Sequence, residues 1–182
     1  LLYYKYIELP EPKAEVEAHR ALCERLGILG RILIAAEGIN GTCCGTEEAI
    51  AEYKSVMNAH PYFFGINFKE SEVTEQVFPR LAVKLRNELV TLRSGTNVRN
   101  AAPYITADDL HTALENKEDM ELIDMRNNYE ADVGRFQGAV TLPVENFRDI
   151  PKELPSLEKY KHKKVVTYCT GGIRCEKASA LL

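Results

Sequence analysis

Residues 164–175 read KVVTYCTGGIRC, and this stretch decides how the second half of the chain is interpreted. The apolar run at 164–168 has the length and composition of a buried strand, and Cys169 follows it directly. Residues 175–182 then begin a helical pattern. A thiol at the carboxyl end of such a strand lies where open α/β sheets bind their ligands. The stretch therefore predicts a strand, a loop that contains Cys169, and a helix.

The loop after Cys169 favours a thiolate over a thiol. Gly171 and Gly172 free the backbone to turn successive N–H groups inward as an anion-binding nest. The helix N-terminus adds about half a positive charge, and Arg174 can add a full one. Thiol pKa values at such sites fall from about 8.5 to about 3.5–7.5. We predict a reactive, nucleophilic Cys169; the alternative is a buried Cys169 that acts only as a small apolar side chain.

The pattern around this loop alternates strands with helices. Thr106 and Asp109 form a capping box ahead of a helix at 107–115, residues 121–125 are typical of a strand, and 138–142 of a short extended piece. Such alternation favours a parallel α/β domain. A doubly wound domain needs a further strand and helix, so we expect this domain to be truncated at its C-terminus.

The first half of the chain carries a different pattern. The expected strands and helices follow the order β-α-β-β-α-β, which is typical of a ferredoxin-like domain. Asn40-Gly41 favours a tight turn inside a hairpin, and Thr46 can cap the second helix. The strands are expected at 2–8, 31–36, 42–44, 64–69 and 80–86, and the helices at 13–26 and after Thr46. No Met stands at position 1, so we expect the natural N-terminus to lie upstream.

Three ranges follow from these patterns. A ferredoxin-like, acylphosphatase-like domain occupies 1–92, a linker occupies 93–103, and the parallel α/β domain occupies 104–182. The linker is rich in Gly, Asn, Arg and Ser and has no periodicity. The predicted fold class is therefore α/β, with two domains.

Composition excludes several classes of protein. The 182 residues have a formal net charge of −4, so a nucleic acid can bind only at a local basic patch. Arg80, Lys84 and Arg86 would share one face of the strand at 80–86 and are candidates for contact with an RNA backbone. The alternative is an ordinary solvated strand face. No run of 18 apolar residues predicts a membrane span, and five cysteines without a disulfide pattern indicate free thiols in a reducing cytoplasm.

The segment 122–175 resembles a rhodanese domain. Asp124, Arg126 and Glu130 match the family's Asp-x-Arg…Glu stretch, and 134–139 matches Gly-His-Ile-x-Gly-Ala with Arg in place of His. The resemblance implies that Cys169 carries a persulfide and that Asp124 and Arg126 support the loop from beneath. The loop is one residue shorter than in related cysteine phosphatases, which argues against phosphate as the substrate.

The whole chain is similar to the rhodanese-containing tRNA uridine hydroxylase family. The stretches at 36–42, 79–92 and 169–180 carry this similarity, together with Cys175, where ordinary rhodaneses commonly have Ser. The resemblance implies conversion of the wobble uridine of bacterial tRNAs to 5-hydroxyuridine by O2, with the anticodon region of tRNA as partner. Cys169 would be catalytic and Cys175 secondary. The active-site loop would comprise Thr170, Gly171, Gly172, Ile173 and Arg174. The sequence contains no pattern for an organic cofactor or a metal.

Two other functions compete with this one. A plain sulfurtransferase would move sulfane sulfur from thiosulfate or a persulfide donor, and it also requires Cys169. A non-catalytic module that binds RNA or protein would tolerate loss of Cys169 but not reversal of the charges at Arg80, Lys84 and Arg86.

Overall fold

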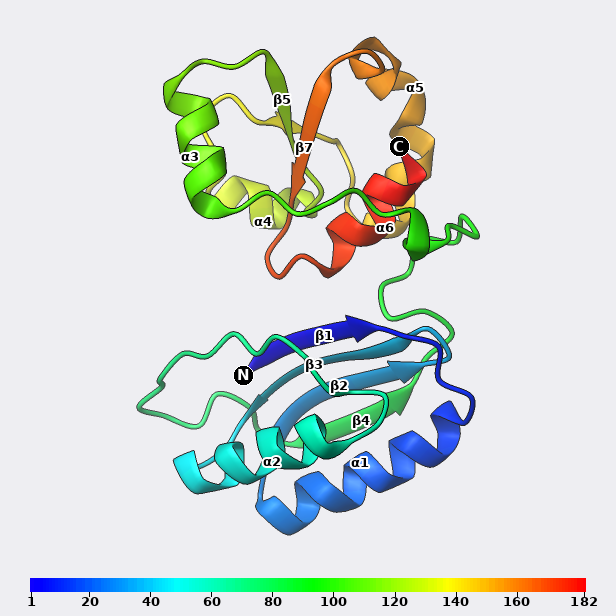
Figure 1. Cartoon of the computed structure of the whole chain (residues 1–182), viewed down its shortest axis with the longest axis vertical. Coiled ribbons are helices and arrows are strands. Elements are labelled where there is room, and N and C mark those ends of the chain that lie inside the picture. Colours follow the sequence, from blue (N-terminus) through cyan, green and yellow to red (C-terminus); the bar gives the residue numbers. More distant parts are fainter. The chain divides into compact units, whose positions relative to one another are not determined.

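The computed structural model describes residues 1–182, which form two compact units, Leu1–Leu89 and Val90–Leu182 (Figure 1). The segment 93–103, our predicted linker, groups with the second unit, where the Ala102 N–H donates to Ser179 Oγ at 3.1 Å. No helix in either unit is both long and apolar enough to cross a membrane.

The first unit is a four-stranded mixed sheet with two helices. Its elements are β1 (Leu2–Tyr6), α1 (Pro12–Leu26), β2 (Leu29–Ala35), β3 (Gly38–Cys44), α2 (Glu47–Ala59) and β4 (Leu81–Leu85). The sheet order is β1-β3-β2-β4; β3 pairs antiparallel with β1 and β2, and β4 pairs parallel with β2. Both helices lie on one face of the sheet (Figure 1). The predicted order of elements is confirmed.

Local signals in the sequence set the ends of these helices. Pro12 opens α1, and Gly27 closes it with φ 67°, where its N–H reaches the carbonyls of Cys23 and Glu24. Thr46 caps α2, since its hydroxyl accepts from the Ala49 N–H at 3.3 Å. Between helices and sheet lies a core that includes Tyr3, Cys23, Ile32, Ile34, Ile39, Tyr53, Met57 and Phe63.

Two local predictions for this unit are wrong. Asn40 and Gly41 lie inside β3, and the hairpin turns at Ala36-Glu37, because Ala35 pairs with Gly38. Gly41 is needed for packing instead, since a Cβ there would lie 2.2 Å from Tyr3 Cζ. Residues 64–69 form no strand; turns occupy 61–65, and only an isolated bridge joins Lys69 to Leu2.

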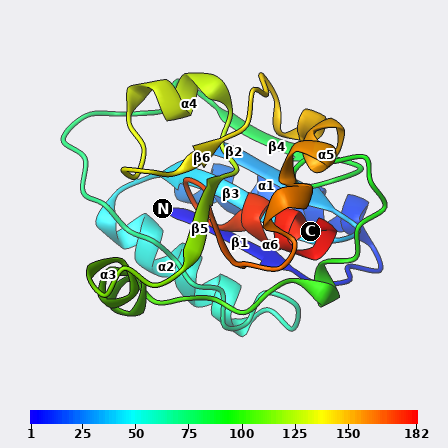
Figure 2. The same cartoon turned by 90° about the horizontal axis from the view of Figure 1, so that it is seen from above.

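The second unit is a parallel three-stranded sheet of order β6-β5-β7, flanked by helices. Figures 1 and 2 both place α3 on one side of β5 and β7 and α6 on the other. Its elements are η1 (Val98–Asn100), α3 (Ala107–Glu115), β5 (Met120–Asp124), α4 (Asn128–Val133), β6 (Val140–Thr141), η2 (Phe147–Glu153), α5 (Leu154–Leu157), η3 (Glu158–Tyr160), β7 (Lys164–Tyr168) and α6 (Ile173–Leu181). The predicted parallel α/β architecture is confirmed.

This sheet positions the predicted loop. The strands β5 and β7 run parallel from Met120↔Lys164 to Asp124↔Tyr168, so both end at the same edge. A separate core that includes Leu92, Ile123, Met125, Leu142, Ile150 and Ala178 supports them. Asp124 and Cys169 therefore emerge side by side at the carboxyl edge of the sheet, where α/β proteins bind ligands.

Candidate active site

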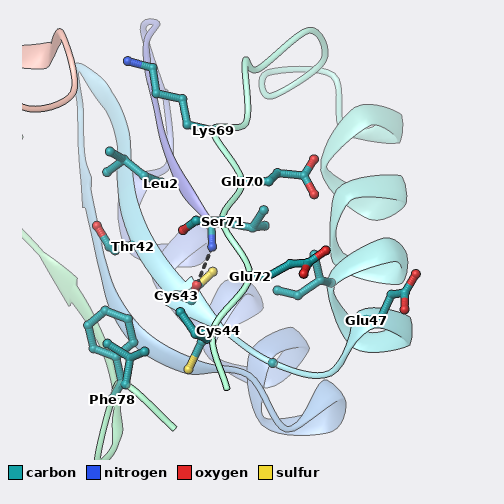
Figure 3. A pocket seen from close by; sticks show the side chains of 15 residues that line it. Leu2, Thr42, Cys43, Cys44, Glu47, Lys69, Glu70, Ser71, Glu72 and Phe78 are labelled. Carbon is teal, nitrogen blue, oxygen red and sulfur yellow. Dashed lines mark hydrogen bonds between the residues drawn. The ribbon is translucent and has the colours of Figure 1, made fainter. Parts of the chain in front are cut away.

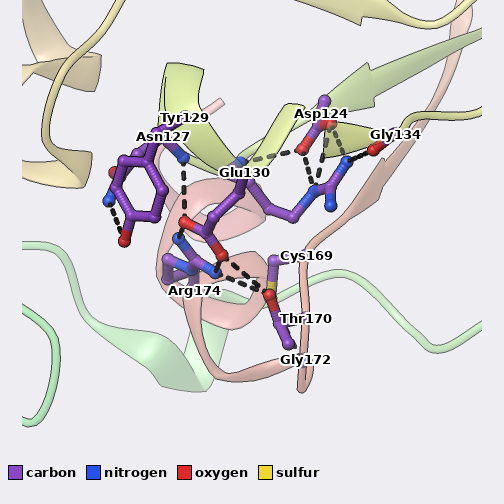
Figure 4. Close-up of polar contacts among 10 residues, drawn as sticks. Asp124, Asn127, Tyr129, Glu130, Gly134, Cys169, Thr170, Gly172 and Arg174 are labelled. Carbon is purple, nitrogen blue, oxygen red and sulfur yellow. Dashed lines mark hydrogen bonds and ion pairs between the residues drawn. The ribbon is translucent and has the colours of Figure 1, made fainter. Parts of the chain in front are cut away.

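Cys169 is the first residue after β7, and its sulfur sits inside the turn that leads into α6 (Figure 4). Gly172 caps α6 with φ 100°, a conformation that glycine adopts without strain. Its N–H donates to Cys169 Sγ at 3.1 Å. The nest that the two glycines predict is therefore present, with the sulfur in the place of the anion.

Hydrogen bonds make Cys169 the acidic thiol of this loop. The donated bond from the Cys175 thiol lowers its pKa most, burial opposes that effect, and the N–H groups of Cys175, Gly171 and Gly172 lower it further. The pKa of Cys175 is raised by the hydrogen bond to Cys169 and by burial. The hydrogen bond therefore favours the negative charge on Cys169 and the proton on Cys175.

Arg174 points to a carboxylate more than to the thiolate. Its guanidinium donates to both oxygens of Glu130, at 2.6 and 2.7 Å, and to Thr170 Oγ1 at 3.1 Å. Thr170 Oγ1 also donates to Glu130 at 2.8 Å. Hydrogen bonds from Arg174 hold the pKa of Glu130 down to about 2, although burial opposes the shift. Burial would lower the pKa of Arg174, but Glu130 and the charge of Cys169 raise it. Arg174 therefore fixes the loop through Glu130 and also lies close enough to Cys169 to interact with its charge.

Glu130 comes from α4, and its own placement follows from a helix cap. The Asn127 N–H donates to Glu130 Oε2 at 3.2 Å, and the two residues form a capping box at the start of α4. Glu130 matches a family motif in the sequence, but the sequence alone assigns it no role. Its distance of about forty positions from the loop hides this contact from any local pattern.

Asp124 and Arg126 tie the ends of the two strands together. Buried Asp124 accepts from Arg126 Nη2 at 2.7 Å and from the Tyr168 hydroxyl at 2.7 Å. Burial would raise the pKa of Asp124, but the hydrogen bonds from Arg126 and Tyr168 lower it. Arg126 also donates to the Gly134 carbonyl at 2.6 Å. Both side chains therefore hold Tyr168, the residue before the loop, and the Gly134 carbonyl in place; that they support the loop itself stays a prediction.

A cavity of about 390 Å³ opens beside the Cys169 sulfur. The ring of Phe136 meets Tyr168 edge to face at 4.9 Å, and the Arg126 guanidinium lies 5.4 Å from the centre of the Tyr168 ring. The volume of this cavity is within the range of small-molecule pockets. The lining comprises Arg126, Gly134, Arg135, Phe136, Tyr168, Cys169 and Thr170.

The three basic residues predicted to bind RNA belong to the first unit. Lys84 lies in β4, Arg80 precedes that strand and Arg86 follows it, and all three are exposed. Buried Val83 points the other way, toward α1 and α2, as the alternation predicts. The three cations therefore lie together on the first unit, whereas the loop around Cys169 belongs to the second unit.

The three remaining thiols belong to the first unit. Burial raises the pKa of Cys23 to about 12 and that of Cys43 to about 11. Cys44 is half-buried and lines a larger cavity, of about 810 Å³, in the first unit (Figure 3). Acidic side chains, Glu47, Glu70 and Glu72, share that lining. No three His, Cys, Asp or Glu side chains come close enough together to hold a metal ion.

Comparison with known proteins agrees with the two units. Residues 1–89 match the UPF0176 acylphosphatase like domain, and residues 106–182 match the rhodanese-like domain. The chain is 42% identical over 184 residues to a tRNA uridine(34) hydroxylase of Cytophaga hutchinsonii and 44% identical over 186 residues to one of Bacillus mycoides. All of the chain aligns in both, but it spans only 59% and 58% of their lengths. By sequence and by domain composition, the chain belongs to the tRNA uridine(34) hydroxylase family.

Proposed function

We propose that the protein containing this chain hydroxylates the wobble uridine of tRNA at C5, with Cys169 as nucleophile and O2 as oxidant. The observation that carries the proposal is the Cys169 sulfur, which accepts a hydrogen bond from the Gly172 N–H and belongs to a residue that lines a cavity together with Phe136 and Tyr168. The relatives are named tRNA uridine(34) hydroxylases, and this name supplies the substrate class. Since tRNA is a cytoplasmic molecule, we place the protein in the cytoplasm.

The anticodon loop is single-stranded, so the wobble base, the first base of the anticodon, can leave the stack at small cost in free energy. We infer that the uracil enters the cavity that Phe136 and Tyr168 help to line, where their rings pack edge to face against each other. Phe136 is 46% exposed, which leaves its ring accessible to a base. Stacking on such rings is worth about 1–3 kcal/mol per base. The entering ring would then face the Cys169 sulfur.

The chemistry that we propose starts at C6 of the base, because C5 of uracil is a weak nucleophile until a group adds to its neighbour. Cys169 Sγ forms a bond to C6, and the C5–C6 π electrons move to C5 and O4 as an enolate. Loop N–H groups and nearby donors stabilise the negative charge. Cys175 keeps its proton during this step, because its pKa is raised.

The enolate then attacks O2, and the electrons balance as follows. One oxygen atom bonds to C5, the C5 proton leaves, and the S–C6 bond breaks to restore the double bond. The other oxygen atom leaves as water after it takes two electrons and two protons from a reductant of the thiol class. The base thus gains one oxygen atom, and Cys169 returns as thiolate.

Sulfur transfer is the second candidate function, and one observation favours it. The nest around Cys169 Sγ has N–H donors on the sulfur itself, which also suits a persulfide anion. In that case, thiosulfate or a persulfide donor would load Cys169, and an acceptor thiol would remove the outer sulfur. Such an enzyme would leave tRNA nucleosides unchanged.

The test is nucleoside mass spectrometry of tRNA from cells that lack the protein. We expect loss of 5-hydroxyuridine and its derivatives, and rescue by the wild type but not by Cys169→Ala. An unchanged profile in a strain without a redundant pathway would reject the hydroxylase. Assays with thiosulfate and persulfide donors would then test the second candidate.

A trapping experiment tests the nucleophile separately. In tRNA with 5-fluorouridine at the wobble position, C5 carries fluorine in place of the proton that must leave. We expect a covalent adduct on the peptide that contains Cys169. An active enzyme that never yields this adduct would refute addition at C6.

A further inference from the structure

The sheet of the first unit leaves one face without helices, since α1 and α2 both cover the other (Figure 1). Strand register shows which side chains share this face. One row across the four strands runs Tyr4, Asn40, Leu33, Lys84, and the next runs Leu2, Thr42, Arg31, Ala82. Adjacent strands are about 4.8 Å apart, so each row spans about 14 Å. We call these two rows, together with Tyr6, the open face.

The open face carries positive charge in an acidic protein. Arg31 of β2 and Lys84 of β4 are exposed side chains on it, and Arg80 and Arg86 flank β4. No strand residue that points to this face is acidic. Glu70 and Glu72 lie near its Thr42 end (Figure 3), where Glu70 is paired with Lys54. A polyanion would therefore follow the β2–β4 half of the sheet.

The opposite half of the open face carries aromatic rings. Tyr4 and Tyr6 alternate with buried Tyr3 and half-buried Lys5 along β1, and the rings of Tyr4 and Tyr6 meet edge to face at 6.1 Å. Asn40 lies directly beside Tyr4 on β3, and Tyr4, Tyr6 and Asn40 are all half-buried. Aromatic rings on a strand accept the faces of unpaired bases, and an adjacent amide can bond to base edges.

We propose that the open face binds single-stranded RNA, with bases on Tyr4 and Tyr6 and phosphates against Arg31 and Lys84. The inference rests on the proposed function, which makes the anticodon loop of tRNA the RNA concerned. Charge complementarity selects a polyanion, and the aromatic half selects unpaired bases over a duplex, whose bases are already stacked. The face thus supplies affinity, whereas the cavity beside Cys169 carries the chemistry.

The test measures binding of the whole gene product to an anticodon stem-loop RNA and to a blunt RNA duplex by fluorescence anisotropy at several salt concentrations. We expect Lys84→Glu and Arg31→Glu each to weaken stem-loop binding by about tenfold or more, and each cation removed to lower the salt slope by about one. Tyr4→Ala should weaken binding of the stem-loop by about fivefold or more, and Tyr4→Phe should bind it as the wild type does. The matched control is Lys13→Glu on α1, which is exposed on the helix-covered side.

Each outcome decides the matter. Binding by Lys84→Glu, Arg31→Glu and Tyr4→Ala at wild-type affinity overturns the inference and leaves a solvated strand face. Equal losses for stem-loop and duplex in Tyr4→Ala overturn the role of the tyrosines. Wild-type protein that binds an acidic protein but no RNA overturns the choice of partner. Nucleoside analysis of tRNA from cells with and without the protein keeps the two proposals apart. If wild-type cells contain 5-hydroxyuridine but the variants bind RNA normally, only the role of the open face is rejected. If wild-type cells contain no 5-hydroxyuridine, the hydroxylase is rejected.

Discussion

Two neighbouring thiols with opposite pKa shifts lie at the candidate site. The hydrogen bond from Cys175 and three backbone N–H groups lower the pKa of Cys169, the proposed nucleophile, whereas the bond to Cys169 and burial raise the pKa of Cys175. The sequence also predicts that the charge of Arg174 lowers the pKa of Cys169. The Arg174 guanidinium donates hydrogen bonds mainly to Glu130. Neutral donors therefore carry most of the activation, and removal of one donor should be visible as a pKa change.

Cys175→Ala should shift the reactivity of Cys169 to higher pH. The substitution removes the hydrogen bond that lowers the Cys169 pKa most. An ordinary free thiol has a pKa of about 8.5. In the wild type, alkylation of Cys169 by iodoacetamide should stay fast well below that pH. In the variant, the alkylation rate should already fall at a higher pH than in the wild type. Peptide mass spectrometry across pH reads the labelling, and buried Cys23, whose pKa is about 12, is the unreactive internal control. Identical profiles would show that Cys175 does not activate Cys169.

Glu130→Gln should loosen the loop while keeping the shape of the side chain. It removes the partner of half-buried Arg174, for an expected loss of about 1–2 kcal/mol in unfolding free energy at pH 7, since partial exposure weakens the pair. The Glu130 pKa falls from 4.5 to about 2 on folding. Its contribution is therefore complete above about pH 5 and is lost as pH falls toward 2.

Urea unfolding of this variant at pH 7 and at pH 3 measures both effects. The difference in unfolding free energy between wild type and Glu130→Gln should be smaller at pH 3 than at pH 7. Asp132→Asn, an exposed substitution on the same helix, is the matched control and should change little. A gap that is independent of pH would mean that packing, and not charge, makes Glu130 important.

Glycines in the first sheet act at the level of the element. Gly41 lies in the middle of β3, directly against buried Tyr3, whose hydroxyl is hydrogen-bonded to Tyr53. Gly41→Ala should therefore destabilise the protein by about 1–3 kcal/mol through overpacking. Asn40→Ala, one position away in the same strand, should cost less than about 1 kcal/mol, because this residue does not form the turn. Chemical denaturation of both variants tests the comparison, and equal costs would contradict it.

What the sequence could predict follows from how local each feature is. Thr46, Thr106 and Gly27 act on their own helix ends, and the predicted caps are present. The loop from Cys169 to Cys175 is continuous, so its nest was visible in the pattern. The contact of Glu130 with Arg174 joins distant positions, and the turn at Ala36-Glu37 carries no strong turn residue. Pairing partners across long separations decide such features, and a single sequence does not reveal them.

At the scale of the whole molecule, the two units have separate hydrophobic cores with no residue in common. Each unit should therefore unfold as its own cooperative element. Ile32 belongs to the first core and Ile150 to the second, and both are fully buried. Truncation of such a side chain to alanine costs about 2–5 kcal/mol.

Hydrogen exchange with mass spectrometry should resolve this independence by segment. Ile32→Ala should speed exchange across β1 to β4 and leave β5 and β7 at wild-type rates, and Ile150→Ala should do the reverse. Covalent labelling of Cys169 provides a second reading, since only Ile150→Ala should disturb the loop that surrounds it. If either variant accelerated exchange equally in both units, the two units would have to fold as one cooperative element. RNA bound on the open face would then also change the stability of the loop that contains Cys169.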